Sequence, residues 1–368
     1  MTRTTKAKER HIEPQKELRV QPAAQAQKSA STTRLQMADI ARLAGVSTST
    51  VSRALSKNPL VHANTRQRIE ELAASLNYSI NVGAQSLRLK ENRTVALVVP
   101  YGRDGRQSLS DPFFLAMLGS IANALTDHGM QMLLSRVDED QLDSVSQIFA
   151  SNRAVGVIIV GQWHNHQLLN QLAVRNLPVV VWGAQLPNQL YRSVGSDNVS
   201  GGLQATRHLI QTGRKRIAFF GDITLPEVAQ RHEGYLKAHA QAKLAPVAAL
   251  SVTMPFVAAQ AQLIVADFLD NTTRKIDAIF AASDVLAMTA ISALSKRNKR
   301  VPEDIAVVGY DDIELAAHLH PSLTTVRQSV ELAGEALVDT LMKLLAGEAA
   351  TSVNLPTLLQ IRESTISD

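Results

Sequence analysis

The stretch Met37–Leu55 reads MADIARLAGVSTSTVSRAL, and its apolar side chains recur at the spacing of two short helices. Gly45 falls between them, where a glycine suits the left-handed end of a helix, and Ser47 is suited to cap the helix that follows. This second helix is expected to end before Pro59, and a third is predicted over residues 64–76. Three short helices with a glycine turn between the first two predict a helix-turn-helix.

The second predicted helix has a polar outer face, because Val46, Val51 and Leu55 are expected to pack it against the first. The capping serine, three further hydroxyls and an arginine then face outward: Ser47, Thr48, Ser49, Thr50 and Arg53. Hydroxyls near a helix N-terminus can approach phosphates and base edges, and an arginine can pair with both acceptors of a guanine. The pattern predicts a helix that reads the major groove of DNA; a helical interaction module with a solvated polar face is the alternative.

Charge is distributed unevenly along the 368 residues. Residues 1–90 hold 15 Lys and Arg against 6 Asp and Glu, a formal charge of +9, whereas residues 91–368 hold 23 against 27. A basic head on a mildly acidic body favours a polyanion-binding module joined to a part that does not bind polyanions. Residues 1–34 are rich in Lys, Arg, Gln, Ala, Ser and Thr, which predicts a disordered basic tail, either inert or weakly phosphate-contacting.

From about residue 93, short continuous apolar runs alternate with amphipathic helical stretches. The runs are Val95–Val99, Met132–Leu134, Val155–Val160, Val179–Trp182, Ile217–Phe220, Ala278–Ala281 and Ile305–Val308. Buried parallel strands alternating with helices predict an α/β fold of the doubly wound parallel-sheet type. About 270 residues exceed one such core, so two lobes are expected. A final strand is expected over Leu355–Arg362.

Several classes of function are disfavoured by what the sequence lacks. It contains no cysteine, which excludes disulfides, thiol catalysis and cysteine-ligated metals. It has no apolar run long enough to cross a membrane and no secretory leader, so a cytoplasmic location is expected. It has no nucleophile elbow, phosphate loop or dinucleotide fingerprint, so we expect neither an enzyme nor a cofactor. His164 and His166 have no neighbouring ligand cluster, and no metal site is predicted.

Ligands of doubly wound sheets bind beyond the carboxyl ends of the strands, and this rule selects candidates. Polar and aromatic side chains follow the predicted strands at Tyr101, Arg136, Gln162, Trp163, Trp182, Asp222, Ser283, Asp284, Tyr310 and Asp311. Tryptophan rings can cover the apolar face of a sugar while polar groups pair with its hydroxyls, so a polyhydroxylated ligand is predicted. Trp163 and Trp182 as core aromatics, and Asp311 as a helix cap, remain alternatives.

Four segments in order along the chain support a family assignment. They are Met37–Leu55, Leu76–Tyr78, Gly309–Asp312 and Pro321–Thr325. Together they resemble the lactose-repressor (LacI/GalR) family of bacterial regulators, and the resemblance runs from residue 36 onward. It implies a helix-turn-helix headpiece on a two-lobed body like that of periplasmic binding proteins. The function it implies is a transcriptional regulator, expected to be a repressor, whose operator affinity is controlled by a sugar.

The resemblance also assigns DNA contacts. It implies that Thr48, Ser49 and Arg53 read bases. It further implies that Tyr78 and Asn81 anchor the headpiece to the DNA backbone. Residues 81–90 resemble the family's hinge helix, and Ala84 and Leu87 would enter the minor groove. Such a short segment is marginally stable alone and is expected to fold only when two copies pair on DNA.

Effector contacts are assigned in the same way. Arg231 matches an arginine that contacts effector in the family, and Asp311 matches the aspartate of its Gly-Tyr-Asp motif. With the strand-end candidates, the expected effector residues are Phe113, Phe114, Trp163, Trp182, Arg231, Ser283, Asp284 and Asp311. A surface position for Arg231, and a core position for one of the two phenylalanines, remain alternatives.

The expected organisation has four parts: a tail at 1–34, the helix-turn-helix at 35–79, a hinge at 80–92 and the body at 93–368. Within the body, residues 93–194 and 325–355 form one lobe, and 195–322 with the C-terminal strand form the other. We expect a homodimer on a palindromic operator, with a mono- or disaccharide effector and no membrane contact. A sugar-binding transport or chemosensory protein, and a sugar-modifying enzyme with an accessory helical domain, remain alternatives.

Overall fold

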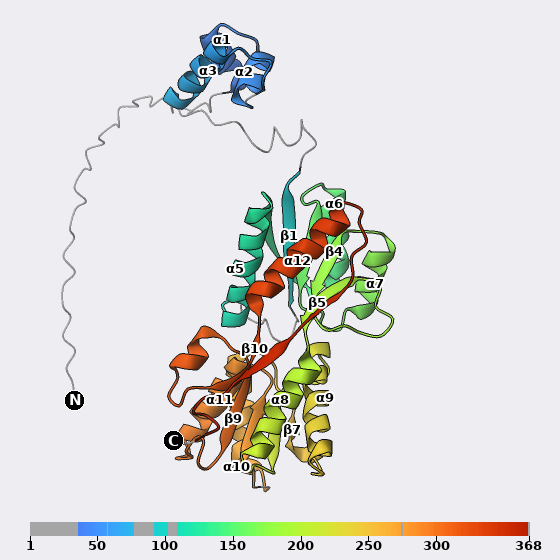
Figure 1. Ribbon diagram of the computed structural model, residues 1–368, viewed down its shortest axis with the longest axis vertical. Coiled ribbons are helices and arrows are strands. Elements are labelled where there is room, and N and C mark those ends of the chain that lie inside the picture. The colour runs from blue at the N-terminus through green and yellow to red at the C-terminus, as the bar shows by residue number, and fades with distance from the viewer. Residues whose placement is uncertain (1–35, 57, 77–91, 102–108, 274, 367–368) are drawn as a thin grey trace, which may run out of the picture. The chain divides into compact units, whose positions relative to one another are not determined.

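The computed structural model describes residues 36–366 except 57, 77–91, 102–108 and 274. The chain divides into two compact units, residues 1–88 and residues 89–368 (Figure 1). The first unit is all-helical where it is described, and the second is α/β. The predicted fold class is therefore confirmed.

The first unit contains α1 (Met37–Ala44), α2 (Thr48–Leu55) and α3 (Ala63–Ser75). The turn after α1 is made by Gly45, whose φ of 65° is left-handed and whose N–H bonds the carbonyls of Ala41 and Arg42. Ile40, Val51 and Ile69, one from each helix, are fully buried against one another. This shared core fixes α2 on α1 and α3, as the apolar spacing predicts.

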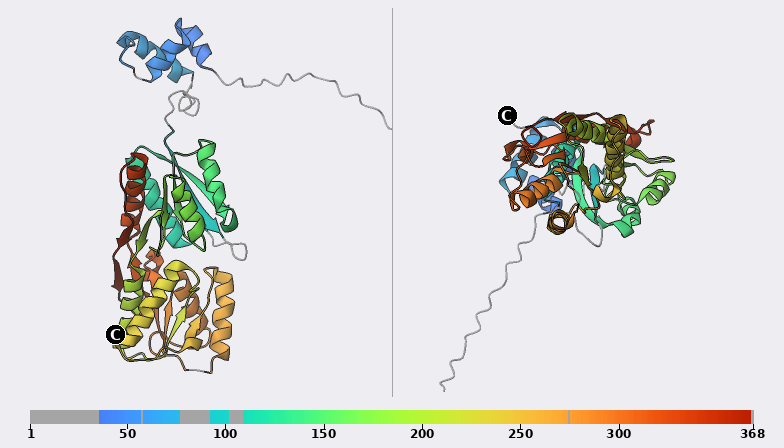
Figure 2. Two further views of the ribbon diagram at one scale, coloured as in Figure 1. Left: turned by 90° about the vertical axis from the view of Figure 1, so that its right-hand side faces the viewer. Right: turned by 90° about the horizontal axis from the view of Figure 1, so that it is seen from below.

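The first lobe of the second unit is built on a parallel six-stranded sheet in the order β11-β5-β4-β3-β1-β2. Its strands are β1 (Thr94–Tyr101), β2 (Gln131–Asp138), β3 (Gly156–Val160), β4 (Val179–Trp182), β5 (Arg192–Ser196) and β11 (Val353–Leu355). Its helices are α5 (Pro112–Asp127), η1 (Glu139–Ser144), α6 (Val145–Ala150), α7 (His166–Val174) and α12 (Val330–Leu345). Helices α5 and α12 cover one face of the sheet, and η1, α6 and α7 cover the other (Figure 2).

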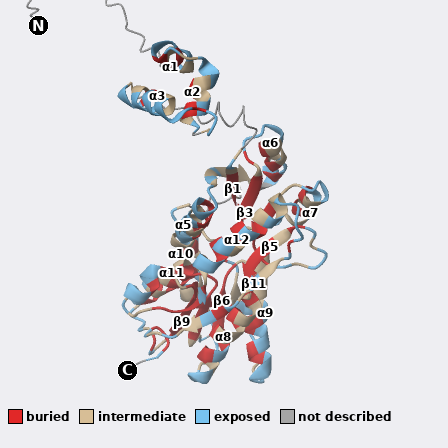
Figure 3. Ribbon diagram, turned by 45° about the horizontal axis from the view of Figure 1, so that its top comes forward, coloured by how far each residue is buried: buried red, intermediate tan, exposed pale blue. Residues whose placement is uncertain are grey.

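The second lobe repeats this arrangement, with the strand order β12-β10-β9-β8-β6-β7. Its strands are β6 (Ile217–Phe220), β7 (Ser251–Val252), β8 (Ala278–Ala281), β9 (Ala306–Asp311), β10 (Thr324–Gln328) and β12 (Thr357–Gln360), of which β12 runs antiparallel to β10. Its helices are α8 (Asn198–Gln211), α9 (Pro226–Gln241), η2 (Ala248–Leu250), α10 (Ala258–Asn271), α11 (Asp284–Ser295) and η3 (Glu314–His318). Helices α8 and α9 cover one face, and α10 and α11 cover the other. In both lobes the central strands are the most deeply buried elements (Figure 3).

The chain passes between the lobes after β5, after β10 and again after β11. Thr324–Arg327 pair with β9, so β10 belongs to the second lobe and the return to the first lobe follows Gln328 rather than residue 325. The expected single strand Leu355–Arg362 is instead two short strands, one in each sheet, separated by Pro356. No helix among the described residues has the length and apolar character needed to cross a lipid bilayer.

Candidate functional site

The outer face of α2 carries the predicted base-reading side chains. Ser47, Thr48, Ser49 and Arg53 are exposed and Thr50 is half-buried. The Ser47 hydroxyl accepts the N–H of Thr50 at 3.2 Å and lies 2.8 Å from the hydroxyls of both Ser49 and Thr50. This capping places a group of short hydroxyls at the N-terminus of the helix, with the longer Arg53 side chain on the same exposed surface. Tyr78, Asn81, Ala84 and Leu87 lie outside the described residues.

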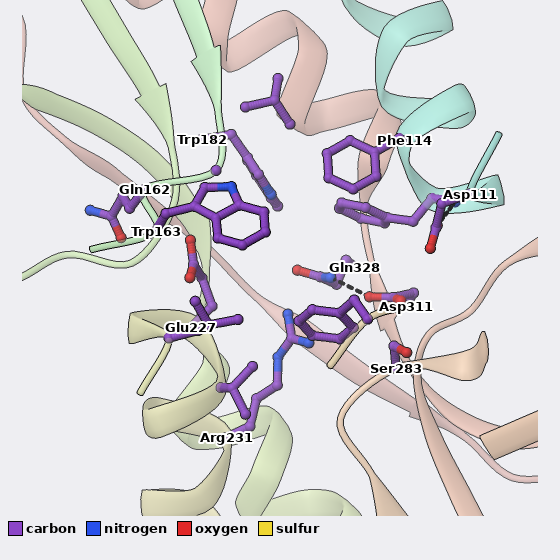
Figure 4. Close-up of a pocket in the computed structure, with 16 residues that line it drawn as sticks. Asp111, Phe114, Gln162, Trp163, Trp182, Glu227, Arg231, Ser283, Asp311 and Gln328 are labelled. Carbon is purple, nitrogen blue, oxygen red and sulfur yellow. Dashed lines mark hydrogen bonds between the residues drawn. The ribbon is translucent and has the colours of Figure 1, made fainter. Parts of the chain in front are cut away.

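A cavity of about 680 Å³ opens between the two lobes of the second unit (Figure 4). The end of β4 and the segments that follow β1 and β3 form its first-lobe side. The ends of β9 and β10 and the segments that follow β6, β7 and β8 form its second-lobe side. The lining residues are Asp111, Phe113, Phe114, Val160, Gly161, Gln162, Trp163, Trp182, Leu225, Glu227, Val228, Arg231, Phe256, Ser283, Asp311 and Gln328. The carboxyl ends of both sheets therefore meet at one pocket, as expected for doubly wound folds.

Four aromatic rings form the first-lobe wall of this cavity. Phe113 contacts Phe114 edge-on with ring centres 6.0 Å apart, and its ring centre lies 6.2 Å from that of Trp182. Phe114 and Trp182 are buried, whereas Phe113 and Trp163 are half-buried. Trp163 has a left-handed φ of 48°, two residues after Gly161, whose φ is 106°. This turn carries the Trp163 side chain from the end of β3 onto the cavity wall.

Arg231 is the central charged group of the second-lobe wall. Its Nε donates to the Asn198 side chain at 2.9 Å and its Nη1 donates to the Ala282 carbonyl at 2.5 Å. The guanidinium carbon lies 3.9 Å from the centre of the Tyr310 ring. The side chain is only 6% exposed, so the surface position considered for Arg231 is not the one observed. These contacts hold the guanidinium in one orientation on the cavity wall.

Asp311 and Glu227 lie on either side of that guanidinium (Figure 4). Gln328 donates to Asp311 at 2.7 Å, and Asp311 has a φ of 122° that is unusual for a residue with a side chain. Burial and the negative charge of Asp111 raise the pKa of Asp311 to about 7, against the lowering effect of Arg231. Burial also raises the pKa of Glu227, although backbone N–H groups and Arg231 favour its charged form.

Ser283 and Asp284, predicted together, occupy different environments. Ser283 lines the cavity and caps α11, because its hydroxyl accepts the N–H of Leu286 at 3.2 Å. Asp284 is fully buried and lies outside the set of residues that line the cavity. Its carboxylate accepts the N–H of Ile313 at 2.9 Å and the hydroxyl of Thr325 at 2.5 Å, which ties α11 to the loop after β9. Burial and the Asp311 charge raise the pKa of Asp284 well above its usual value.

The other predicted effector residues do line the cavity: Phe113, Phe114, Trp163, Trp182, Arg231 and Asp311. Besides Asp284, four strand-end candidates do not, namely Tyr101, Arg136, Asp222 and Tyr310. Sequence reasoning missed Glu227, Phe256 and Gln328 as wall residues. Gln328 ends β10, whose sequence TTVRQ is too polar to show as an apolar run. Glu227 sits in the first turn of α9, where an acidic residue is ordinarily explained by the helix dipole.

Two family models match the chain. Residues 36–81 match the model described as bacterial regulatory proteins, lacI family, and residues 206–365 match the periplasmic binding protein-like domain. The transcriptional regulator CelR of Thermobifida fusca is 32% identical over 88% of this chain and 96% of its own length. The transcriptional repressor PurR of Aliivibrio fischeri is 31% identical over 83% of this chain and 90% of its own length.

Solved structures show the same likeness. A lac repressor dimer bound to operator and the anti-inducer ONPF matches 90% of this chain and 99% of its own, with a TM-score of 0.80 and 26% identity. A complex of CelR with cellobiose matches 90% of this chain and all of its own, with a TM-score of 0.67 and 31% identity. Both the helix-turn-helix and the two-lobed body therefore have counterparts among transcriptional regulators.

Proposed function

The chain belongs to the lacI family of bacterial regulatory proteins and is a DNA-binding transcriptional regulator, not an enzyme; we propose that it represses by binding a palindromic operator as a homodimer. We further propose that a mono- or disaccharide in the cavity between the lobes sets its affinity for the operator. We propose that it acts in the bacterial cytoplasm, where the operator DNA lies.

The two-sided chemistry of the cavity carries the effector proposal. Aromatic rings on one wall can cover the apolar face of a pyranose, and the carboxylates, amide and hydroxyl of the other can pair with its hydroxyl groups. The space of about 680 Å³ includes the part of the cavity that is open to solvent, so a ligand can enter it from outside. The solved complex of CelR with cellobiose is consistent with a disaccharide.

Apolar side chains on the first lobe support the homodimer. Leu115 on α5, Leu134 on β2 and Leu332 on α12 are exposed, and β2 is an edge strand of its sheet. A second copy that covers these side chains would remove apolar surface from water, which favours association. The operator complex of the related lac repressor contains a dimer, and a two-fold protein suits an operator with matching symmetry.

Two aromatic rings of the cavity can couple effector binding to DNA binding. Phe113 packs against the cores of both lobes, and Trp163 from the first lobe packs against the core of the second. A sugar that displaces these rings would alter how the lobes pack on each other. We propose that this changes the separation of the two copies of residues 80–92 and so the grip on DNA. Such coupling is typically worth about 1–3 kcal/mol and acts equally on effector affinity.

Footprinting of the full-length protein on genomic promoter DNA, followed by fluorescence anisotropy on the protected sequence, tests the DNA-binding role. Arg53→Ala should cost about 1–3 kcal/mol in specific binding and relax the preference at one base pair. Arg42→Ala removes the same charge from α1 and is the control, since it should leave sequence preference intact. Specific binding that survives Arg53→Ala unchanged would contradict the assignment of α2 as the recognition helix.

A further inference from the structure

We propose that the cavity accepts only effectors without net negative charge, that is neutral or amino sugars, and excludes their phosphorylated and carboxylated counterparts. This inference rests on the proposed function and narrows its effector class. Three features of the cavity lead to it: the charges of its described lining residues, the bonds already made by Arg231, and the hydrogen bonds at the helix ends beside it.

The charges that line the cavity are mostly negative. Among the lining residues, Asp111, Glu227 and Asp311 carry carboxylates, and Arg231 carries the single guanidinium. Arg231 lies between Glu227 and Asp311 and favours the charged form of both. Its positive charge therefore serves to balance the protein's own carboxylates. An added anion would enter a partly desolvated space in which, among the described lining residues, carboxyl groups outnumber the one guanidinium.

The guanidinium of Arg231 is also poorly placed to clamp an anion. Recognition of phosphate or carboxylate by arginine usually employs two parallel N–H groups of one fork. Here Nε already donates to Asn198 and Nη1 to the Ala282 carbonyl, and the face of the group lies on the Tyr310 ring. A phosphate that used the fork formed by Nε and an Nη group would have to compete with Asn198 for the Nε donor, and one that used the two Nη groups would share Nη1 with the Ala282 carbonyl.

Helix N-termini are the other common anion sites in α/β proteins, and three that begin beside lining residues, those of α5, α9 and α11, offer fewer N–H groups than an uncapped helix end. At α5 the Asp111 carboxylate accepts the N–H of Phe113 at 3.0 Å. At α11 the Ser283 hydroxyl accepts the N–H of Leu286. At α9 the first turn contains Pro226, which has no N–H, and Glu227, whose carboxylate accepts its own backbone N–H. Each end thus presents an oxygen, or lacks a donor, where an anion would need N–H groups.

The titration of the cavity carboxylates points the same way. Burial and the negative charge of Asp111 already raise the pKa of Asp311 to about 7, so the cavity resists further negative charge. A bound anion would raise this pKa further and take up protons, and its affinity would fall as pH rises through neutrality. An ammonium group would lower the same pKa and would bind better as pH rises. A neutral sugar should show the weakest pH dependence of the three.

The tryptophans allow a direct test, because the chain has only two, Trp163 and Trp182, and both line the cavity. The full-length protein is titrated by intrinsic fluorescence with a panel of common mono- and disaccharides. Each responding parent is then compared with its amino, phosphate and acid derivatives. We expect the anionic derivatives to bind about 100-fold more weakly than the parent, as one added like-charge contact in a partly desolvated site implies. An anionic derivative that binds as tightly as its parent, or a panel in which no neutral or amino sugar binds, would overturn the proposal.

Glu227→Gln supplies the second test, since it removes one cavity charge and keeps the shape of the side chain. It should reduce the difference in affinity between a parent sugar and its anionic derivative. The control Glu233→Gln, on the exposed part of α9 and paired with Lys237, should leave this difference unchanged. An unchanged difference in Glu227→Gln would contradict the inference. Operator binding is measured separately by anisotropy, so loss of the proposed DNA function is distinguishable from a wrong effector class.

Discussion

The two lobes of the body share one architecture but contribute different chemistry to the cavity between them. The first lobe supplies most of the rings, from Phe113, Phe114, Trp163 and Trp182, with Asp111 and Gln162 beside them; the second supplies most of the charged and hydroxyl groups, from Glu227, Arg231, Ser283 and Asp311, with one ring, Phe256. Ring stacking is tolerant of the hydroxyl pattern of a sugar, whereas buried polar groups penalise a ligand that leaves them unpaired. The comparison indicates that the first lobe provides affinity for sugars in general and the second selects among them.

The same division appears in the backbone at the strand ends. In the first lobe, the left-handed Trp163 brings a ring to the cavity. In the second, consecutive left-handed residues at Asp311 and Asp312 end β9, and only the first of these side chains lines the cavity. Asp312 instead pairs with Arg327 at 3.2 Å and Arg362 at 2.6 Å, and so fixes the strained turn. Strained backbone of this kind is concentrated at functional sites.

The largest effect on sugar binding and stability is expected from Arg231→Ala, which removes the cation from the second-lobe side of the cavity. It would leave Asp311 and Glu227 buried without their cation, at a cost of about 3 kcal/mol in the free energy of unfolding. Sugar binding should be abolished in a fluorescence titration, and urea denaturation should give the stability change. The control is Arg207→Ala on the surface of α8, where the arginine bonds only the exposed Gln241 side chain among the described contacts. Retained sugar binding in Arg231→Ala would show that the second-lobe side of the cavity is not needed to recognise the sugar.

A smaller but more discriminating effect is expected from Trp182→Leu in the aromatic wall. Replacing a buried ring by a smaller side chain should destabilise the body by about 1–3 kcal/mol. Affinity for different neutral sugars should fall by a similar factor for each, because the ring contacts no particular hydroxyl. Calorimetric titration with a set of epimeric sugars measures this. A change in the order of sugar preference would contradict the division of roles between the walls.

The smallest effect is expected on stability at acidic pH, and it is assigned to histidines of the second lobe. His208, His232 and His239 are buried or half-buried in the second lobe, and burial lowers the pKa of each. Because the folded-state pKa lies below the unfolded value, their contribution to stability is present above about pH 6.5 and is lost as pH falls through the folded pKa.

The variant His239→Gln keeps a donor for the Tyr235 carbonyl, which His239 contacts at 3.0 Å, and cannot gain charge. Between neutral pH and pH 5, its unfolding midpoint in urea should fall less than that of the parent protein. His318→Gln, at an exposed position on η3, is the matched control. Equal loss of stability in all three proteins would exclude His239 as an acid-sensitive group.

Much of the body could be predicted because its central strands are continuous apolar runs. Val179–Trp182, Ile217–Phe220 and Ala278–Ala281 are β4, β6 and β8 with the same bounds. Strands with polar or very short sequences were not predicted, such as β5, RSVGS, and β10, TTVRQ. Their hydrogen-bonding neighbours and not their composition make them strands, and such long-range pairing leaves no local periodicity.

Site residues could be predicted where the strand-end rule fixes their position. They could not be predicted where contacts with distant residues decide whether a side chain faces the cavity or the core. The strand-end rule finds Trp163, Trp182, Ser283 and Asp311, since these positions follow directly from the topology. It fails for Asp284, next to Ser283, because the N–H of Ile313 and the hydroxyl of Thr325 hold that carboxylate in the core. Contacts across 29 and 41 residues of sequence decide this orientation, and they become visible only in the folded chain.

On the proposed function, occupancy of the cavity changes the affinity of the helix-turn-helix for its operator. The most direct test of this coupling is fluorescence anisotropy of the full-length protein on the footprinted operator, with and without a saturating sugar that the fluorescence titration has identified. Operator affinity should change by about 5–150-fold, the range usual for coupled sites. Identical operator affinity with the cavity empty and saturated would contradict the coupling.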